Sequence, residues 1–597
     1  MPDVEEKWLD EKEKEALQYI EDITTKADEI QRQILNEILS TNANVEYLQQ
    51  HGLVVPTDSP TFKKLIPLVC YEQLRPYIAR IADGDDSSIL CSNPITEFFK
   101  SSGTSGGEHK LIPMYEQEFV RRLSFFSYIM PRMKQLFPDI NWHKVKGLNF
   151  HFAKPEFKTK GGIIVRSIFT NLHKRSSNLE SMPSGNNTSP DDIILCTDSY
   201  QSLYCQLLCG LYQNEVVFRV SALFASTLIH VFKFLENHWV DLATDIRTRT
   251  VNPKITNSSV RESLMKIIVK PNPEVADLIE NECRKGRWEG IITRLWPNAK
   301  YINAIVTGSM SQYIPLLNYY TNNLPIVSDH YGSSECFLGL NLDPLCNHDE
   351  VSYTLIPTMA YFEFLPIDMI NDPNGEVNQQ LVDLVDVKLG REYELVITTF
   401  AGLYRYCMGD IVRVTGFKNK APSFRFVRRK NVVLNISNEK TDEAGLHKAV
   451  EEGGRVMKSF GAKIVDYTTY ADLSTIPGHY VLYWELTMDD LKEQNSNDIP
   501  SSVFEDCCLD IENSLNLLYR LARSHEKCIN PLEIKIVKAG TFEKLMQLAL
   551  DRGASITQYK TPRCLNSSQI HIIQLLESNV VSNYFSRKYP NLDTNPV

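Results

Sequence analysis

Hydroxyl-bearing and glycine residues are concentrated in residues 101–110, which read Ser-Ser-Gly-Thr-Ser-Gly-Gly-Glu-His-Lys and follow the apolar pair Phe98 and Phe99. Glycines permit positive φ and close approach of a ligand, while hydroxyl and backbone N–H groups together can surround an anion. The segment is therefore typical of a phosphate-binding loop, with a plain Ser/Gly linker as the alternative. It does not have the spacing of GxxxxGK[ST] or GxGxxG, which argues against a kinase-type P-loop and a dinucleotide-binding turn.

Two further clusters place a carboxylate next to a strand-like run. Residues 330–335 read His-Tyr-Gly-Ser-Ser-Glu and follow the apolar run 324–327, so Glu335 lies beside hydroxyl groups in a strand-to-loop turn. A Mg²⁺ ion that bridges phosphates needs such an oxygen ligand. Residues 402–410 end in Gly409-Asp410, just before the strand-like run 411–414, where an aspartate can accept hydrogen bonds from ribose hydroxyls. Gly-Asp is also a common turn, so neither cluster is decisive alone.

Composition and charge exclude several classes of protein. The 597 residues include 43% apolar and 23% charged residues with 27 Gly and 29 Pro, which argues against disordered and collagen-like chains. The net charge of −11, without a dense Lys/Arg block, argues against nucleic-acid binding. The charged first residues do not resemble a secretory signal, and the apolar stretch 220–234 is too short to cross a bilayer. We expect a cytoplasmic protein that is not embedded in a membrane.

The 13 cysteines are scattered along the chain, which favours buried, reduced thiols over a metal site. Cys205 and Cys209 fit one face of a helix, but no histidine lies at ligand spacing from them.

Hydrophobic spacing divides the chain into regions of different character. Residues 5–50 have apolar positions at three-to-four spacing and predict a packed amphipathic helix. From 145 to 345, helical patterns alternate with short β-rich runs, which predicts α/β layers. These runs are 163–165, 193–195, 301–306 and 326–327. Segments 176–192 and 371–375 are rich in turn-forming residues and predict a surface loop and a turn.

The region 351–435 is richer in strands, which could form a barrel or a small sheet. Beyond the basic segment 428–431, helical and strand patterns alternate again. The helical patterns are 441–460 and 503–522, and the strand patterns are 480–484 and 532–537. We therefore predict two domains, 1–428 and 429–597, of which the second is a smaller α/β domain.

Together and in this order, the three clusters resemble those of the adenylate-forming superfamily. Within it they are most similar to the Gretchen Hagen 3 acyl acid amido synthetases of plants. The likeness extends over almost the whole chain and includes Thr-Gly-Ser-Met at 307–310, Tyr-Phe-Glu-Phe at 361–364, Pro-Gly-His-Tyr at 477–480 and Gln-Tyr-Lys-Thr-Pro-Arg-Cys at 558–564.

This resemblance implies a fold and a reaction. The fold is α/β with two domains, as in luciferase: a large N-terminal domain with a β-barrel and helix-flanked sheets, and a small C-terminal α/β domain that moves between half-reactions. In the reaction a carboxylic acid and ATP, with Mg²⁺, give an acyl adenylate, which an amino acid converts to an amide. A carboxylate is a poor electrophile, so activation requires a good leaving group and oriented charge rather than an enzyme nucleophile.

The resemblance also implies roles for individual residues. Lys560 on the mobile domain and the metal ligand Glu335 are expected to be catalytic. The residues expected at the nucleotide are Ser101, Ser102, Thr104, Ser105, Tyr331, Ser334, Asp410 and Lys440. Those expected around the acyl acid are Arg122, Ile168, Phe169, His330, Gly332 and Phe337. For Arg122, a solvated charge on a helix is the alternative.

Departures from the family pattern concern the acyl site. Auxin-conjugating members usually have Met-Tyr-Ala where this chain has His330-Tyr331-Gly332, and Tyr where it has Phe337. His109 and Cys407 replace arginines of their pattern. These departures leave the acyl pocket open, since the Gly-Ser-Ser-Glu form is commoner in members that act on benzoates. The family resemblance implies an auxin such as indole-3-acetic acid, joined to Asp or Glu, with a benzoate-type acid or a longer auxin precursor as alternatives. A sensor that binds acyl acid or AMP without catalysis is the alternative from another class.

Overall fold

The computed structural model describes residues 9–105, 108–176, 187–367, 381–430, 434–437, 439–488, 499–551, 561–565 and 569–592. The chain forms two compact units. One comprises Met1–Ser101 and Lys110–Lys430, and the other comprises Asn431–Val597 together with Ser102–His109.

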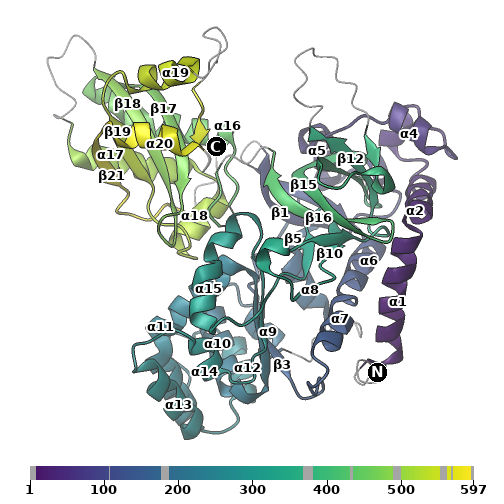
Figure 1. The fold of residues 1–597 in the computed structure, drawn as a ribbon, viewed down its shortest axis with the longest axis horizontal. Coiled ribbons are helices and arrows are strands. Elements are labelled where there is room, and N and C mark those ends of the chain that lie inside the picture. The colour runs from purple at the N-terminus through teal and green to yellow at the C-terminus, as the bar shows by residue number, and fades with distance from the viewer. Residues whose placement is uncertain are drawn as a thin grey trace. The chain divides into compact units, whose positions relative to one another are not determined.

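The first unit contains a parallel sheet of four strands in the order β3-β6-β7-β8. Its strands are β3 (Lys146–Phe150), β6 (Val217–Phe224), β7 (Tyr301–Ile305) and β8 (Ile326–Val327). Parallel neighbours need long crossover connections, and here helices provide them. These helices are α10 (Ser199–Tyr212), α11 (Ala225–Thr248), α12 (Ser258–Ile267), α13 (Pro273–Cys283), α14 (Ile291–Leu295) and α15 (Ile314–Thr321). In Figure 1 they gather around this sheet in teal.

An eight-stranded sheet follows in the same unit, and its strand pairs are antiparallel. In spatial order its strands are β13 (Val382–Asp383), β12 (Tyr361–Pro366), β14 (Glu392–Thr398), β15 (Tyr406–Lys418), β16 (Ala421–Arg429), β11 (Tyr353–Leu355), β10 (Phe337–Leu340) and β9 (His330–Gly332). All three residue clusters singled out in the sequence lie on strands or on the turns beside them, and two of the three belong to this sheet.

A further sheet has the order β2-β1-β5-β4, and its residues belong to the first unit except those within 102–109. Its strands are β1 (Glu97–Ser105), β2 (Glu108–Met114), β4 (Phe157–Lys158) and β5 (Ile164–Arg166). The remaining helices that the argument uses are α1 (Glu11–Thr25), α2 (Ala27–Thr41), α3 (Glu46–Gln50), α4 (Ser59–Leu65), α5 (Tyr71–Asp83), α6 (Glu116–Phe126), α7 (Ile129–Leu136), α8 (Ile168–Ser176) and α9 (Asp191–Ile194). One hydrophobic core joins these helices, except α9, to the eight-stranded sheet.

The prediction of a single continuous helix over residues 5–50 is wrong, because this range contains separate helices. The backbone of Lys26 leaves the helical region, with φ −104° and ψ 28°, and separates α1 from α2. Asp10 caps α1 by accepting a hydrogen bond from the Glu13 backbone N–H. The three-to-four spacing correctly indicated helix, but spacing alone does not show where the chain turns.

The second unit is built on a five-stranded sheet of order β20-β17-β18-β19-β21. Its strands are β17 (Ala462–Asp472), β18 (His479–Met488), β19 (Glu533–Val537), β20 (Cys564–Leu565) and β21 (Val580–Phe585). Its helices are α16 (Glu443–Gly454), α17 (Ser501–Ser514), α18 (Leu517–Ser524), α19 (Thr541–Asp551) and α20 (Ile570–Glu577). The helix predicted over 503–522 is two helices, because Leu515 is extended and Asn516 caps α18 through the Tyr519 backbone N–H.

One predicted strand is also wrong. Residues 193–195 read as β-rich, but Ile193 and Ile194 belong to α9, and Leu195 is its C-terminal cap. Pro190 precedes this helix with φ −64°, and Asp191 and Asp192 occupy its first turn, where carboxylates are favoured. The predicted turn 371–375 lies outside the described residues, as does most of the predicted loop 176–192.

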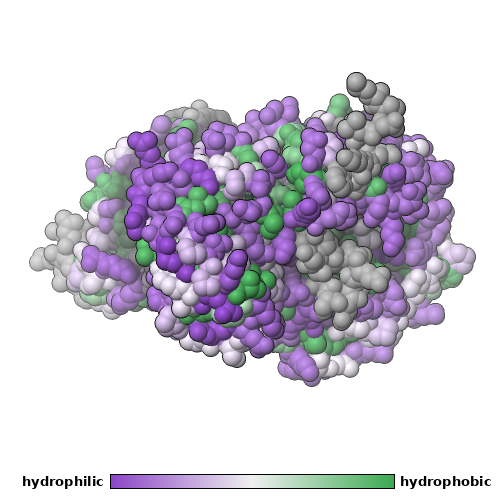
Figure 2. Space-filling view, turned by 90° about the horizontal axis from the view of Figure 1, so that it is seen from below, coloured by the Kyte–Doolittle hydropathy of each residue, from purple (hydrophilic) through white to green (hydrophobic). Residues whose placement is uncertain are grey.

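The face shown in Figure 2 is mainly hydrophilic, with small separate hydrophobic spots. Among the described helices, none combines the length and the apolar composition needed to cross a membrane.

Candidate functional site

Asp410 lies in β15, directly opposite Arg429 in β16. The Asp410 residue is 5% exposed, and its Oδ1 atom lies 3.4 Å from Arg429 Nε. Its Oδ2 atom accepts a hydrogen bond from the Tyr331 hydroxyl. Gly409, immediately before it, has φ 74°, which an L side chain rarely adopts, so glycine is favoured there. The structure therefore brings together two predicted nucleotide residues, Asp410 and Tyr331.

Arg429 is a candidate site residue that was not predicted from the sequence. In the sequence it is simply one residue of the basic segment 428–431 near the domain boundary. Burial acts to lower the pKa of its guanidinium, but the carboxylates of Asp410 and Glu335 outweigh burial and raise that pKa. Arg429 is therefore a permanent cation beside two carboxylates. The pairing of residues 410 and 429 across a hairpin that turns near 419–420 could have revealed it.

Glu335 is held on a tight turn between β9 and β10. Glu335 is 2% exposed. The Ser333 hydroxyl accepts hydrogen bonds from the backbone N–H groups of Glu335, at 3.2 Å, and Cys336, at 3.3 Å. Ser334, predicted at the nucleotide, lies on the same turn. The turn thus places a buried carboxylate at a fixed position.

Arg122, in α6, fastens this turn from the other side. Its Nη1 donates to the Ser334 carbonyl at 2.7 Å, and its Nη2 donates to the Glu335 carbonyl at 2.5 Å. Its Nε donates to Glu118 Oε1 at 3.0 Å, and the Arg122 residue is 2% exposed. A solvated helix charge is therefore the wrong alternative for Arg122. The predicted role at the acyl acid stays a prediction, whereas the observed contacts position the turn that carries Glu335.

Tyr406 and Lys110 extend the cluster around Glu335. The Tyr406 hydroxyl lies 3.5 Å from Glu335 Oε1, and Lys110 Nζ donates to that hydroxyl at 3.3 Å. Burial, followed by the charge of Glu335, raises the pKa of Tyr406 well above its usual value, so this phenol keeps its proton. Both residues belong to motifs noticed in the sequence, but no spacing rule indicated that they would meet.

The predicted phosphate loop is part of a sheet rather than a linker. Strand β1 extends to Ser105, β2 begins at Glu108, and the two strands are hydrogen-bonded neighbours. Ser101 is 7% exposed. The structure does not describe the side chains of Ser102, Thr104 and Ser105, so their contact with phosphates stays a prediction.

Two of the predicted acyl residues meet in an aromatic cluster. The rings of His330 and Phe337 pack against Phe126, with centroid distances of 5.6 and 5.0 Å, and also approach Phe125. His330 Nδ1 lies 2.6 Å from Asp329 Oδ1. Phe125 and Phe126 were missed, although they lie three and four positions after Arg122, on the same side of α6.

For the other predicted acyl residues, the structure shows burial or packing. Ile168 and Phe169 begin α8, and both pack, partly buried, against the large hydrophobic core of the first unit. Gly332 leaves no room for a side chain, because a Cβ atom there would lie 2.5 Å from Phe337 Cδ1.

The predicted lysines of the second unit are only partly described. Lys440 is half-buried, and its carbonyl accepts a hydrogen bond from Asn516 Nδ2 at 3.0 Å. The preceding Glu439 is fully buried, and burial raises its pKa to about 7. Lys560 lies outside the described residues.

Family models cover most of the chain. The GH3 family N-terminal domain matches residues 16–326, the GH3 family central domain matches 353–429, and the GH3 family C-terminal domain matches 444–569. The chain belongs to the GH3 family. The resemblance inferred from the sequence is therefore confirmed, and the expected α/β fold class with it.

GH3 relatives match over nearly the full length. Indole-3-acetic acid-amido synthetase GH3.6 of Arabidopsis thaliana is 55% identical, and the match covers 98% of this chain and 96% of the relative. Indole-3-acetic acid-amido synthetase GH3.5 of Arabidopsis thaliana is also 55% identical, covering 98% and 95%. The solved structure of GH3.15 acyl acid amido synthetase is 45% identical with TM-score 0.66, and covers 97% of this chain and 98% of that chain.

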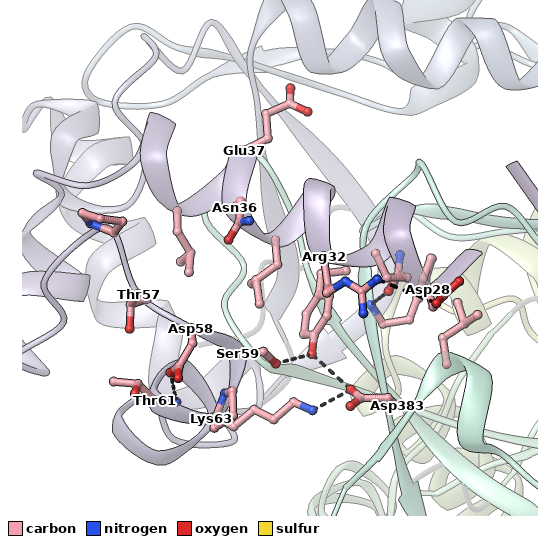
Figure 3. Close-up of a pocket in the computed structure, with 18 of the residues that line it drawn as sticks. Asp28, Arg32, Asn36, Glu37, Thr57, Asp58, Ser59, Thr61, Lys63 and Asp383 are labelled. Carbon is pink, nitrogen blue, oxygen red and sulfur yellow. Dashed lines mark hydrogen bonds and ion pairs between the residues drawn. The ribbon is translucent and has the colours of Figure 1, made fainter. Parts of the chain in front are cut away.

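The first unit also has a cavity that is lined by none of the predicted site residues. A cavity of about 1300 Å³ lies between α2, the segment leading into α4, and β12. Figure 3 shows Lys63 and Ser59 on one side and Asp383 on the other. Lys63 Nζ lies 2.5 Å from Asp383 Oδ1, which also accepts from the Tyr361 hydroxyl. The charged and polar groups of Lys63, Asp383 and Tyr361 thus pair with one another at this cavity. We therefore place the candidate site at the Asp410 and Glu335 cluster, on the chemistry of its side chains rather than on the size of a cavity.

Metal and thiol chemistry is limited in the part of the chain that the structure describes. It contains no group of three or more His, Cys, Asp or Glu side chains that could hold a metal ion. Cys205 and Cys209 are buried free thiols of α10.

Proposed function

We propose that this protein is an ATP-dependent acyl acid amido synthetase that adenylates indole-3-acetic acid, or a similar hormone-type acid, and joins it to an amino acid. Asp and Glu are the favoured amino acids. The observation that most supports the proposed acid and reaction is that relatives 55% identical over 98% of the chain are named indole-3-acetic acid-amido synthetases.

The proposed reaction has two steps. First, a carboxylate oxygen of the acid attacks the α-phosphorus of ATP, and pyrophosphate leaves. Then the amine of the amino acid attacks the acyl carbon, AMP leaves, and the amine gives up a proton. Both steps depend on orienting groups and offsetting charge rather than on an enzyme nucleophile. Arg429 and Lys110, next to Asp410 and Tyr406, supply such fixed charge.

Glu335 is the proposed Mg²⁺ ligand. Mg²⁺ is commonly held by one or two carboxylates together with substrate phosphates. The buried Glu335 carboxylate, on a turn fastened by Arg122, fits that donor set. When bound, the ion would offset negative charge on the phosphates.

The proposed ribose contact is Asp410, and its replacement by Asn should weaken ATP binding. Loss of the charge removes hydrogen bonds worth about 1.5–3 kcal/mol, so the KM for ATP should rise about 10- to 100-fold while that for the acid changes little. Steady-state kinetics with each substrate varied in turn measures both constants.

Glu392→Gln is the matched control for Asp410→Asn, because it makes the same carboxyl-to-amide change on the neighbouring strand β14. Among the described side chains, the Glu392 carboxylate pairs with Arg413 and Arg428, so its loss should leave the KM for ATP unchanged. An unaltered KM for ATP in Asp410→Asn would mean that Asp410 only stabilises the hairpin.

The proposed acyl site predicts a change of acid preference in His330→Met with Gly332→Ala. The methionine removes a polar edge from the aromatic cluster, and the new Cβ atom forces the Phe337 ring to move. Changes of one methylene discriminate by about 10- to 200-fold, so the ratios of kcat/KM should shift towards indole-3-acetic acid. The comparison acids are a longer indole or phenoxy alkanoic acid and a substituted benzoate.

The single variant His330→Met separates the loss of the polar edge from the movement of the Phe337 ring, since it adds no Cβ atom at position 332. If the ratios among the acids stay the same in both variants, the acid binds elsewhere.

Acid-dependent exchange of pyrophosphate into ATP, measured over the same panel of acids, tests the proposal directly. Mass spectrometry then identifies the amide formed with each amino acid. Exchange without amide would indicate another acceptor, and acid binding without exchange would favour the sensor alternative. For the compartment we propose the cytoplasm, and microscopy of a fluorescent fusion checks it.

A further inference from the structure

Two histidines and an aspartate form a hydrogen-bonded chain in the first unit. His151 directly follows β3, His173 lies in α8, and Asp191 begins α9. His151 Nδ1 lies 2.8 Å from His173 Nε2, and His173 Nδ1 lies 2.9 Å from Asp191 Oδ1. None of the three residues belongs to the nucleotide cluster.

When both imidazole rings are neutral, the order of the three groups determines which ring nitrogen atoms carry protons. An ionised carboxylate can only accept, so Nδ1 of His173 donates to Asp191. With both rings neutral, Nε2 of His173 then accepts from Nδ1–H of His151. Nε2 of His151 is left without a proton and can accept a hydrogen bond.

The His151 ring lies beside Phe169, one of the predicted acyl residues. Its centroid is 5.5 Å from that of Phe169, and the residue is only partly buried. Gln206 fixes its backbone by accepting from the His151 N–H at 3.2 Å and donating to the His151 carbonyl at 2.9 Å. Among the described residues, no hydrogen bond uses His151 Nε2.

Arg219 connects this ring to the other side of the predicted acyl site. Its charge acts on His151 and also on Asp329, the partner of His330. His151 directly follows β3, and Asp329 lies two residues after the end of β8, so both lie past the carboxyl ends of strands of the parallel sheet. Ligands of parallel sheets commonly bind at that edge.

The ring is suited to accept a hydrogen bond rather than to take a proton. Burial first, then His173 and Arg219, lower the pKa of His151 to about 3. At neutral pH the ring therefore stays uncharged, and a general base with so low a pKa would be inefficient.

We propose that His151 Nε2 selects acyl acids whose ring carries a hydrogen-bond donor, such as an indole N–H or an aryl hydroxyl, and that His173 and Asp191 position it. This inference rests on the proposed function. It adds to that function a polar criterion for the acid, beside the apolar contacts of Phe169 and Phe337.

The test compares indole-3-acetic acid with benzofuran-3-acetic acid, which has the same shape but an oxygen in place of the N–H group. The ratio of their kcat/KM values in acid-dependent pyrophosphate exchange should favour the indole. In His151→Leu this ratio should fall about three- to tenfold, the range of one neutral hydrogen bond. The loss should come from the indole, because the benzofuran never makes the bond.

Further variants separate positioning from structure. His151→Gln keeps an acceptor and should retain part of the preference. His173→Phe should lower the same ratio, with no further fall when combined with His151→Leu, because both remove one interaction. His348→Leu, at a histidine whose side chain is 45% exposed, is the matched control and should change nothing. Poor folding would affect both acids equally and leave the ratio intact.

The outcomes distinguish this inference from the proposed function. An active enzyme whose ratio is the same in wild type, His151→Leu and His173→Phe overturns the inference and leaves the function standing. Absence of exchange with every acid in the wild type overturns the function, and the inference falls with it.

Discussion

Glu335→Gln is expected to slow acid-dependent pyrophosphate exchange by about 10²–10³-fold, the loss typical of removing one preorganised electrostatic group. The amide has nearly the same shape, so the turn held by Arg122 and Ser333 should persist. What disappears is the negative charge that, in the proposed role, would attract the metal ion. Rates measured over a range of Mg²⁺ concentrations should show a higher requirement in the variant.

Glu350→Gln is the matched control for this prediction, because the Glu350 side chain is exposed and its carboxylate accepts a hydrogen bond from the Asn347 amide. It should behave as the wild type. If Glu335→Gln exchanged pyrophosphate at the wild-type rate, Glu335 would be a structural residue of the turn and the metal ligand would have to be sought elsewhere.

Lys560→Ala is expected to reduce exchange by a similar factor of about 10²–10³ while the fold is retained. The residues that follow Lys560 are firmly anchored on β17. Thr561 Oγ1 donates to Asp466 Oδ2 at 2.7 Å, and the Arg563 guanidinium donates to the Tyr467 carbonyl at 2.7 Å. This anchoring does not depend on the lysine side chain, so circular dichroism and the unfolding temperature should not change.

The second half-reaction provides the control for Lys560→Ala. Formation of amide from chemically supplied acyl adenylate should suffer much less, because the phosphate charge that Lys560 would offset has already left. Lys588→Ala, at an exposed lysine of the same unit, should leave both half-reactions unaltered. Equal losses in the two half-reactions would contradict a role confined to adenylation.

Element types were predicted from the sequence more reliably than element ends. The predicted strand-rich region 351–435 contains β11, β12, β14, β15 and β16, and the run 480–484 lies in β18, because long apolar or alternating runs have few alternatives. The breaks at Lys26 and Leu515 were missed, since a single residue that leaves the helical region does not disturb the surrounding spacing. The strand prediction at 193–195 was wrong for another reason. A run of three apolar residues is compatible with both a strand and one buried helical turn.

By itself, the sequence determined the family, the reaction class and the identity of most candidate residues, because these depend on local motifs whose residue types carry the chemistry. Only the tertiary structure decided which side chains meet. Arg429 faces Asp410 through the register of a hairpin, and Arg122 reaches the Glu335 turn across more than 200 positions of sequence. The chain of His151, His173 and Asp191 joins three separate elements. Such contacts depend on long-range packing and strand register, and neither is encoded in the local spacing of residues.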